Sequence, residues 1–426
     1  MSINRRILLI TYYFPPLTAA QSIRWFYLSR ELSKLGYDID VLTIKMSERF
    51  RDLLSDVPEK IAVYRTFPGP FYYLTFRYSA ESHRNEKAPG NTDYLWRILS
   101  AIHFKAYKAL NLFSMPDIQS EWFPFAITRG LELINTNKYR VIISSSDPRV
   151  CHLLGYFLKK RSGIPWIADY GDPWIWPMPN VPEPKSKRSI LEKLEKKIVR
   201  DMDAITVAAE GMKSLYLEKY PFLDKEKIQV ITQGFDPELF SQVKEETSTN
   251  FRIVFCGSFY RKIRDPIGFF EAIKEIDKED IEVIIAGRIG PFMDTLRKEH
   301  LTDKINYRGF LNHKQSLALQ KSAAVLLHIG NITDAQVPGK IYEYIGARRP
   351  ILCIRGGTGD ASAEFVIRYN KGIVVNNNKE AIKAGIMRLY ELWEKDLLDT
   401  RFNIDIIEDF TWRKSAENIT GIIEDL

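Results

Sequence analysis

Residues 336–352 read QVPGKIYEYIGARRPIL, which predicts a loop, a short helix and then a buried strand. Pro338 suits the first turn of a helix, because its missing N–H would be unpaired there anyway. The free N–H groups at such a helix start favour an anion, and Lys340 adds a full charge nearby. Glu343 lies one turn further along, where its carboxylate can accept hydrogen bonds from a vicinal diol such as a ribose. The stretch therefore predicts either a nucleotide site, with phosphate at Gly339 and Lys340, or an ordinary amphipathic helix with surface charges.

The alternation of helix and strand extends outward from this stretch over almost the whole chain. Such alternation is typical of βαβ units and a parallel sheet. In the first half the predicted strands are Ile7–Thr11, Asp38–Ile44, Ile61–Thr66, Val141–Ser145, Trp166–Asp169, Ala204–Ala208 and Ile228–Thr232. In the second half they are Arg252–Cys256, Glu282–Ala286, Ile305–Arg308, Ala324–His328, Ile351–Ile354 and Gly372–Val375. Ser22–Leu35 is predicted as a helix, because its apolar residues share one helical face and Gly36 follows its end.

A polar, turn-rich segment at 234–250 divides this alternation into two halves. We therefore predict an α/β protein of two doubly wound Rossmann-like domains, residues 1–233 and 234–408, with ligands at the carboxyl ends of the strands and in a central cleft. The amphipathic segment 409–426 is predicted as a C-terminal helix that packs back on the first domain. Residues of about 67–116 interrupt the alternation and are predicted to form an insertion, either a surface subdomain or a contact for an acceptor or membrane.

The composition indicates a globular protein with sizeable cores. Of the 426 residues, 45% are hydrophobic and 27% charged, and no apolar run approaches the roughly 20 residues that span a bilayer. Three cysteines far apart in the chain indicate a reducing compartment and no disulfide framework, so a cytoplasmic protein is expected. The net charge of +7 is spread along the chain, and no zinc-finger spacing, RNA-binding aromatic motif or basic tail favours nucleic acid as a partner.

Four stretches together resemble the family-4 glycosyltransferases, which have the two-Rossmann fold called GT-B. These stretches are Tyr12–Pro16 with Ser22–Arg24; Pro116–Trp122 with Ser144–Pro148 and Gly163–Trp174; Phe255–Tyr260 with Arg264–Pro266; and the segment quoted first. The resemblance spans nearly the whole chain. It implies a retaining enzyme that moves a sugar from a nucleoside-diphosphate sugar to a glycan or lipid-linked acceptor, in the synthesis of surface polysaccharide or another glycoconjugate.

The resemblance implies that the donor binds the second domain. The residues that match the donor side are Gly257, Arg261, Arg264, Phe310, Gly339, Lys340 and Glu343. Arg264 would stabilise the charge that builds on the leaving diphosphate, unless it belongs to an ordinary basic surface loop. Glu343 would hold the ribose, and Phe310 would either lie in the loop that reads the base or belong to the core. Ala335 stands where relatives have a first glutamate near the transferred sugar, so the sugar is left open.

The first domain would take the acceptor, near Ala20, Gln21 and Arg24. Asp169 and Asp172 flank a tight turn at the end of a strand, where a carboxylate could accept from sugar hydroxyls or polarise the hydroxyl of the acceptor. The predicted catalytic residues are therefore Asp169, Asp172 and Arg264, with Asp169 the stronger aspartate. The alternatives are structural hydrogen bonds or a helix cap for the aspartates, and structural carbonyl or carboxylate partners for Arg24.

No metal and no cofactor beyond the sugar nucleotide are expected. Asp201-Met202-Asp203 has the spacing of a metal-binding Asp-x-Asp but is expected to be a cap, and the six histidines form no ligand spacing. Two other functions stay open: a nucleotide-sugar epimerase or hydrolase of the same fold, and a non-catalytic relative that binds a sugar nucleotide. Aromatic residues in Phe71–Tyr78 and the segment Leu95–Phe113 could place the protein at the inner face of a membrane.

Overall fold

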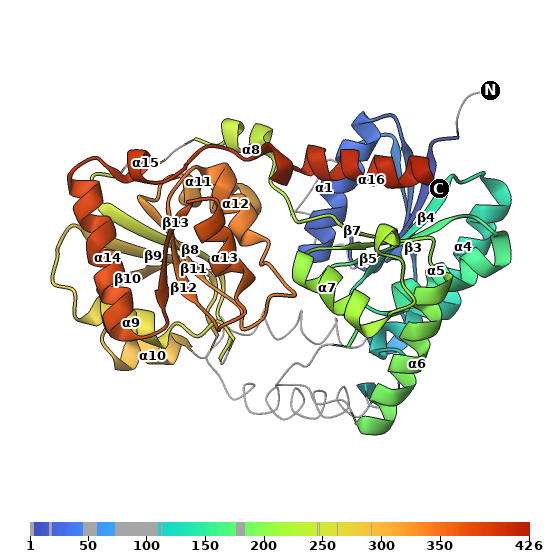
Figure 1. Ribbon diagram of the computed structural model, residues 1–426, viewed down its shortest axis with the longest axis horizontal. Helices are drawn as coiled ribbons and strands as arrows, with labels where there is room; N and C mark the ends of the chain where they lie inside the picture. The colour runs from blue at the N-terminus through green and yellow to red at the C-terminus, as the bar shows by residue number, and fades with distance from the viewer. Residues whose placement is uncertain are drawn as a thin grey trace, which may run out of the picture. The chain divides into compact units, whose positions relative to one another are not determined.

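The protein forms two compact units (Figure 1). The computed structural model describes residues 4–16, 19–45, 58–72, 110–111, 114–175, 184–244, 246, 248–261, 263–290 and 292–426. Unit 1 comprises Met1–Val207, Tyr216–Val230 and Ala416–Leu426, and unit 2 comprises Ala208–Leu215 and Ile231–Ser415. Within these described ranges, no helix is long and apolar enough to cross a membrane.

Unit 1 is built on a parallel sheet of seven described strands in the order β3-β2-β1-β4-β5-β6-β7. The strands are β1 (Arg6–Thr11), β2 (Asp38–Ile44), β3 (Ile61–Thr66), β4 (Val141–Ser146), β5 (Trp166–Tyr170), β6 (Ala204–Val207) and β7 (Ile228–Val230). Its helices are α1 (Ala20–Lys34), η2 (Ile118–Trp122), α4 (Phe123–Thr136), α5 (Val150–Ser162), α6 (Lys185–Asp201) and η3 (Lys225–Lys227). The residues of α7 (Glu210–Lys219) and α16 (Trp412–Asp425) are divided between the two units. In unit 1, Arg140 donates to the carbonyl oxygen of Ile423 in α16 at 2.9 Å.

Unit 2 repeats this pattern with six described strands in the order β10-β9-β8-β11-β12-β13. The strands are β8 (Phe251–Ser258), β9 (Ile281–Arg288), β10 (Ile305–Tyr307), β11 (Val325–Ile329), β12 (Ile351–Arg355) and β13 (Gly372–Asn376). The helices are α8 (Pro237–Gln242), α9 (Ile267–Lys274), α10 (Phe292–Lys298), α11 (His313–Lys321), α12 (Lys340–Ala347), α13 (Ala361–Arg368), α14 (Lys379–Glu394), α15 (Leu398–Arg401) and η4 (Glu408–Phe410).

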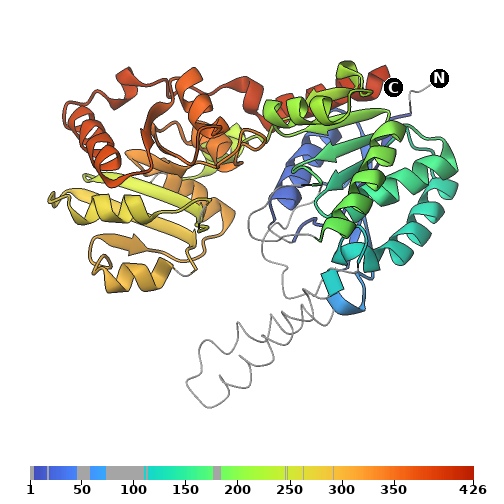
Figure 2. The same cartoon turned by 60° about the horizontal axis from the view of Figure 1, so that its bottom comes forward.

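Helices cover both faces of the sheet in unit 2 (Figures 1 and 2). Successive side chains of a strand point to opposite faces, so each strand feeds two cores. Ile253 and Phe255 belong to an apolar cluster that includes residues of α9, α10 and α14. Val254 and Cys256 belong to a second cluster, with residues of α8, α11, α12 and α13. Burial on both faces explains why the strands read as continuous apolar runs in the sequence.

The predicted fold class is confirmed. All thirteen predicted strands are present in the described residues, with ends within two residues of the predicted ones, and every pairing between named strands is parallel. In each sheet the strand order reverses beside the strand that comes first in the chain: β1 neighbours β4 in unit 1, and β8 neighbours β11 in unit 2. Ligands of such open sheets bind outside the carboxyl ends of the strands at this switch point.

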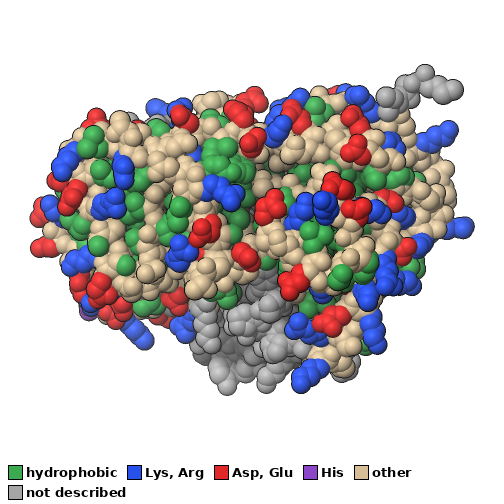
Figure 3. All heavy atoms as spheres, in the orientation of Figure 1, with side chains coloured by type: hydrophobic (Ala, Val, Ile, Leu, Met, Phe, Trp, Pro, Cys, Tyr) green, Lys and Arg blue, Asp and Glu red, His purple; other side chains and the backbone are tan. Residues whose placement is uncertain are grey.

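Part of the predicted insertion lies outside the described residues. This holds for residues 73–109 and 112–113, and so for most of the segments Phe71–Tyr78 and Leu95–Phe113. On the face seen in Figure 3, basic and acidic side chains are interspersed over the described residues. The net charge of +7 is therefore not gathered into one basic patch on that face.

Candidate nucleotide site

The donor-side residues predicted from the sequence lie in unit 2, at the end of a strand, in the loops that follow the strands or in the first turn of α12. Gly257 is in the last two residues of β8, and Arg264 lies in the loop that leaves this strand. Phe310 follows β10, and Lys340 begins α12, the helix after β11. Because the strands are parallel, these loops meet at the carboxyl edge of the sheet.

Arg264 is held at the switch point of this sheet. Its backbone pairs with Tyr260, since Arg264 N donates to the Tyr260 carbonyl at 2.9 Å and Tyr260 N donates back at 3.2 Å. The guanidinium carbon lies 5.9 Å from the centroid of the Tyr260 ring. Nε donates to Oδ1 of Asn331 at 2.9 Å. Because Asn331 follows β11, this bond joins the loops that leave the two strands flanking the switch point.

The side chain of Asn331 extends this connection to Gln336. Asn331 is buried, and its Nδ2 donates to Oε1 of Gln336 at 2.9 Å. An arginine can only donate, so Oδ1 of Asn331 must face Arg264 and its amide nitrogen must face Gln336. Sequence reasoning gave no role to either amide, and the only local signal is their position just after a buried strand.

Lys340 and Glu343 form an ion pair in the first turn of α12. Lys340 Nζ lies 2.7 Å from Glu343 Oε2, and Gln320 Nε2 donates to the same oxygen at 3.0 Å. His313 Nε2 lies 3.4 Å from the other oxygen, Oε1. Gly339 caps the helix start and is exposed.

The charges of this pair reinforce each other. Burial opposes ionisation of Glu343, but Lys340 and His313 outweigh it and hold the pKa of this carboxyl well below its usual range. Burial likewise opposes the charge on Lys340, and the facing carboxylate of Glu343 raises its pKa above the usual value. Both groups are therefore charged at neutral pH. The backbone N–H groups of Ile341, Tyr342 and Glu343 already donate to the carbonyls of Pro338 and Gly339, so the ammonium of Lys340 is the main positive charge at the start of α12.

The two further partners of Glu343, His313 and Gln320, were not predicted from the sequence. They lie seven residues apart on α11 and so share one face of that helix. His313 is the first residue of the helix, after the cap Asn312. The cap pattern could have placed His313 at a helix start, but no local spacing links it to Glu343.

The last residues of β8 and β9 lie close together, and the segment after β10 joins them. Gly287 has a φ of +121°, and a Cβ at this position would overlap the carbonyl oxygen of Gly257. Gly287 N also donates to the carbonyl of Gly309 at 2.7 Å. Phe310 is 61% exposed, so the alternative that it belongs to the core is excluded. Arg261 is exposed in the loop after β8.

The acceptor-side residues lie in unit 1, and most of them are internal. Asp169 lies in β5 and is 0% exposed. Both of its carboxylate oxygens accept hydrogen bonds from the guanidinium of Arg24, with Nη2–Oδ1 at 2.8 Å and Nε–Oδ2 at 3.2 Å. Oδ2 also accepts from Trp25 and Ser145, and Oδ1 from Thr206. Burial raises the pKa of this carboxyl, but Arg24 and these donors outweigh it, so the pKa is lowered. The geometry therefore fits the structural alternative for Asp169 and Arg24, not contact with a substrate.

The other three residues of this group differ in exposure. Gln21 is buried and donates from Nε2 to Ser145 Oγ at 2.8 Å and to the carbonyl of Ser146. Ala20 is exposed at the first position of α1. Asp172 lies two residues beyond β5 and is half-buried. Ala20 and Asp172 therefore remain the predicted residues that a ligand can reach at this edge.

Asp117 is a buried titratable group at the same edge of unit 1. Its Oδ2 accepts from Val150 N, at the start of α5, at 3.3 Å. Burial first, and then the nearby exposed Asp147, raise the pKa of Asp117 to about 7. Unfolded aspartate titrates near 3.9. The folded protein therefore binds this proton more tightly than the unfolded chain between about pH 4 and pH 7, and stability falls as the pH rises through that window.

Asp117→Asn should flatten this pH dependence. We expect the free energy of unfolding of the wild type to fall between pH 5 and pH 8 by on the order of a few kcal/mol more than that of the variant. Urea unfolding followed by tryptophan fluorescence at both pH values measures the difference. Asp147→Asn, which removes only the second cause, serves as the control with a smaller effect. Equal pH slopes in wild type and Asp117→Asn would contradict the prediction.

The Asp-x-Asp pattern has a structural role, although not the predicted one. Asp201 is the last residue of α6, and Asp201 and Asp203 bind Lys160 and Lys159 of α5, each with a nitrogen–oxygen distance of 2.5 Å. Asp203 also accepts from the backbone N of Trp166 at 2.7 Å. Neither aspartate caps a following helix. In the part of the chain that the structure describes, no group of three or more His, Cys, Asp or Glu side chains could hold a metal ion.

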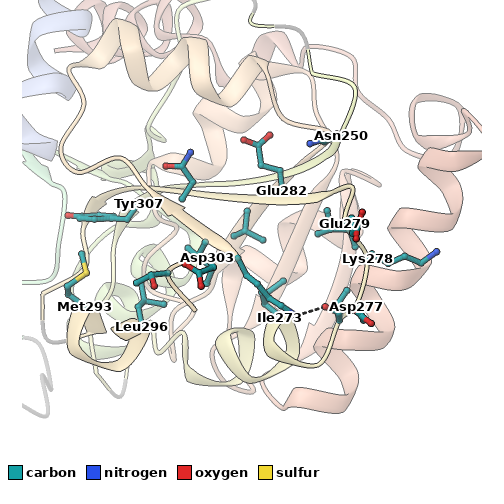
Figure 4. A pocket seen from close by; sticks show the side chains of 17 residues that line it. Asn250, Ile273, Asp277, Lys278, Glu279, Glu282, Met293, Leu296, Asp303 and Tyr307 are labelled. Carbon is teal, nitrogen blue, oxygen red and sulfur yellow. Dashed lines mark hydrogen bonds between the residues drawn. The ribbon is translucent and has the colours of Figure 1, made fainter. Parts of the chain in front are cut away.

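A cavity of about 790 Å³ lies elsewhere in unit 2 (Figure 4). It is lined by residues at the amino ends of β9 and β10 and by the segment after α9, including Asp277, Glu279 and Asp303. None of the predicted donor-side residues lines it. Its lining is centred on the amino end of β9 and on the short β10, whereas open α/β sheets bind ligands outside the carboxyl ends of their strands at the switch point.

Comparison with known proteins agrees with this architecture. Residues 250–392 match the family model described as "Glycosyl transferases group 1". No curated protein matches the chain. Sucrose-phosphate synthase from Thermosynechococcus elongatus is 15% identical with a TM-score of 0.64, over 99% of this chain and 98% of that one. HepE from Anabaena, in complex with UDP and glucose, is 12% identical with a TM-score of 0.61, over 99% and 100% of the two chains.

A third similar structure carries a different description. It is a putative UDP-N-acetylglucosamine 2-epimerase from Listeria monocytogenes, 14% identical with a TM-score of 0.59, over 99% of this chain and 96% of that one. At these identities the likeness concerns the fold alone. The chain therefore has the GT-B fold, and the stretch that matches the group 1 glycosyltransferase model lies within unit 2.

Proposed function

We propose that the protein transfers a sugar from a nucleoside-diphosphate sugar to a glycan or lipid-linked acceptor, with retention and without a metal. The observation that carries the proposal is the bond between Arg264 and Asn331, which fixes a guanidinium at the switch point of a group 1 glycosyltransferase domain. Similar structures support a sugar nucleotide as donor, since HepE forms complexes with UDP and with UDP-glucose.

In this proposal the diphosphate binds between Arg264 and the start of α12. A guanidinium matches phosphate geometry and stays charged, while Lys340 and the positive end of the α12 dipole favour the same anion. These groups stabilise the charge that develops on the leaving diphosphate, which is the largest electrostatic demand of the transfer. Glu343 binds the ribose. The exposed ring of Phe310 lies in the loop proposed to approach the base.

Arg264→Lys tests the phosphate role of the guanidinium. Lysine keeps the charge but lacks the planar fork that both bonds Asn331 and matches a phosphate. We expect the affinity for a nucleoside diphosphate to fall about tenfold, corresponding to about 1.4 kcal/mol, with little change for the nucleoside alone. Isothermal titration calorimetry with UDP and uridine, or with the matching pair for another base, measures both. Equal losses for the diphosphate and the nucleoside would argue against a phosphate contact.

The most direct test of the whole donor site is a thermal-shift screen over nucleoside diphosphates. A ligand that binds the folded state alone raises the melting temperature, so one base should stand out. No shift with any of them would count against the proposal. Turnover of the donor with an acceptor then tests transfer, the configuration of the product tests retention, and the rate with a chelator tests metal independence.

An epimerase or hydrolase is the second candidate, because a putative epimerase shares the fold over nearly the whole chain. Such an enzyme would convert the sugar nucleotide without any acceptor, whereas a transferase needs both substrates. Incubation with the donor alone separates the two. A non-catalytic relative would bind the donor but would convert it neither alone nor in the presence of an acceptor.

The acceptor side of the proposal rests on Asp172 and Ala20 in unit 1. We further propose that the protein acts in surface polysaccharide or glycoconjugate synthesis, in the cytoplasm and at the inner face of a membrane. Flotation with liposomes that contain or lack anionic lipid tests the membrane contact. Absence of binding to both would contradict it.

A further inference from the structure

The helix α6 of unit 1 turns a strongly basic face outward. Of its fully exposed charged residues, six are basic and only Glu192 is acidic. The basic ones are Lys185, Arg188, Lys193, Lys196, Lys197 and Arg200. Figure 1 labels α6 at the lower right, and most charged side chains in that region of Figure 3 are basic. This helix is therefore a local exception to the mixed charges of the rest of that face.

The cations of this face are mostly not neutralised by neighbouring carboxylates. Within the ranges that the structure describes, Arg188 alone among the six has a carboxylate partner, Glu192, at 3.1 Å. Exposed lysines elsewhere can be paired, as Lys274 is with Glu299 at 2.8 Å. Five like charges without carboxylate partners along one helix repel each other, so the face favours an anionic partner.

Large apolar side chains are exposed beside these cations. Ile190 of α6 is 54% exposed, Phe157 of the neighbouring α5 is 45% exposed, and Phe222 is 43% exposed. The guanidinium carbon of Arg200 lies 4.8 Å from the centroid of the Phe222 ring. The face therefore combines basic groups with apolar side chains that are left in water.

This combination fits an anionic lipid bilayer. Basic side chains are attracted to anionic headgroups, while exposed aliphatic and aromatic side chains enter the boundary between headgroups and acyl chains. The 17 residues of α6 extend over about 25 Å, so the cations can meet several headgroups at once. Ile190 offers no flat ring on which a nucleobase could stack, which favours lipid over RNA as the partner.

We propose that the outward face of α6, together with the exposed Phe157 and Phe222, is the surface on which the protein docks to an anionic bilayer. The inference rests on the membrane location in the proposed function and gives that contact a definite place. It differs from the aromatic segments that the sequence suggested for this contact. Binding of donor or acceptor does not enter the argument.

Flotation of the full chain with lipid vesicles tests the proposal. The vesicles contain phosphatidylcholine alone or phosphatidylcholine mixed with phosphatidylglycerol. One variant replaces three cations of α6 that have no carboxylate partner: Lys185→Gln, Lys193→Gln and Lys196→Gln. The matched control replaces three exposed lysines of unit 2: Lys298→Gln, Lys314→Gln and Lys395→Gln. Both variants change the net charge equally and keep a long polar side chain at each position.

The wild type is expected to float with the mixed vesicles only, and more weakly as salt is added, because salt screens the headgroup attraction. Each basic residue near an anionic surface contributes roughly fivefold in affinity. The α6 variant should therefore bind about a hundredfold more weakly, whereas the unit 2 control should match the wild type. All six lysines are exposed, so thermal unfolding should give melting temperatures near that of the wild type.

An environment-sensitive dye shows where the bilayer meets the protein. The three native cysteines are buried, so the dye can be attached selectively to Ile190→Cys or, as the control in unit 2, to Lys314→Cys. With the mixed vesicles, the emission should shift to the blue at position 190 and stay unchanged at position 314.

Equal losses in the two lysine variants, no loss in either, or an unchanged emission at position 190 would overturn the inference. Binding of an RNA oligonucleotide through the same lysines, without binding to vesicles, would overturn it in favour of nucleic acid. Absence of vesicle binding leaves the transferase proposal to its own tests with soluble nucleotides. Failure of those tests leaves docking through α6 standing.

Discussion

Replacing Arg24 by methionine is expected to destabilise unit 1 by about 3–5 kcal/mol, which is the usual cost of removing one partner of a buried ion pair. Arg24 and Asp169 are both 0% exposed, and the carboxylate would be left as an uncompensated charge in the core. Urea unfolding followed by tryptophan fluorescence measures the loss, since Trp25 itself donates to Asp169 at 2.9 Å.

Two variants make this prediction specific. The double variant Arg24→Met, Asp169→Asn leaves no charge behind, so it should be more stable than Arg24→Met alone. Arg188→Ala removes half of an exposed pair with Glu192, whose side chains are 49% and 46% exposed, and should cost less than about 1 kcal/mol. A loss for Arg24→Met as small as that for Arg188→Ala would show that the buried pair does not stabilise the fold.

The second large effect is expected at the donor site. Glu343→Ala should weaken the binding of a nucleoside diphosphate by about two orders of magnitude, or about 2.7 kcal/mol. The substitution removes the acceptor proposed for the ribose, and Lys340 and His313 lose the carboxylate that they face. Calorimetry with the diphosphate found in the thermal-shift screen measures the change.

Pyrophosphate separates the ribose contact from the phosphate contact in this experiment. Glu343→Ala leaves the charge of Lys340 unneutralised, so the affinity for pyrophosphate should hold or rise while that for the nucleoside is lost. Glu343→Gln keeps the size of the side chain and one carbonyl oxygen, so its affinity for the nucleoside should lie between those of the wild type and Glu343→Ala. Unchanged affinity for the nucleoside in both variants would remove the ribose assignment of Glu343.

Local sequence patterns were enough to predict the two sheets. The strands in both units are short apolar runs separated by amphipathic helices, and Ile7–Ile10 is a run whose residues are all within 1% of full burial. Such runs occur when both faces of a parallel strand are covered. Capping residues and glycines likewise predicted where helices end. Gly36, for example, follows α1 and has a φ of +93°.

Patterns were less informative about side chains that point into the protein. The position of Asp169 near the end of a strand suggested contact with substrate, but β5 lies between β4 and β6 and its residues face two cores. Burial then decides the role of the carboxylate, because a charge without water needs a partner of opposite sign. Asp172, three residues later, is half-buried, so its carboxylate can keep contact with water and does not need such a partner.

The sequence by itself determined the α/β class, the thirteen strands and the helix start around Lys340 and Glu343, because these depend on periodicity and on residues close together in the chain. Only the tertiary structure paired Arg24 with Asp169, which lies 145 residues away, and brought His313 and Gln320 of α11 to Glu343 of α12. Such contacts depend on strand order and helix packing, which bring distant residues together without any fixed spacing in the sequence.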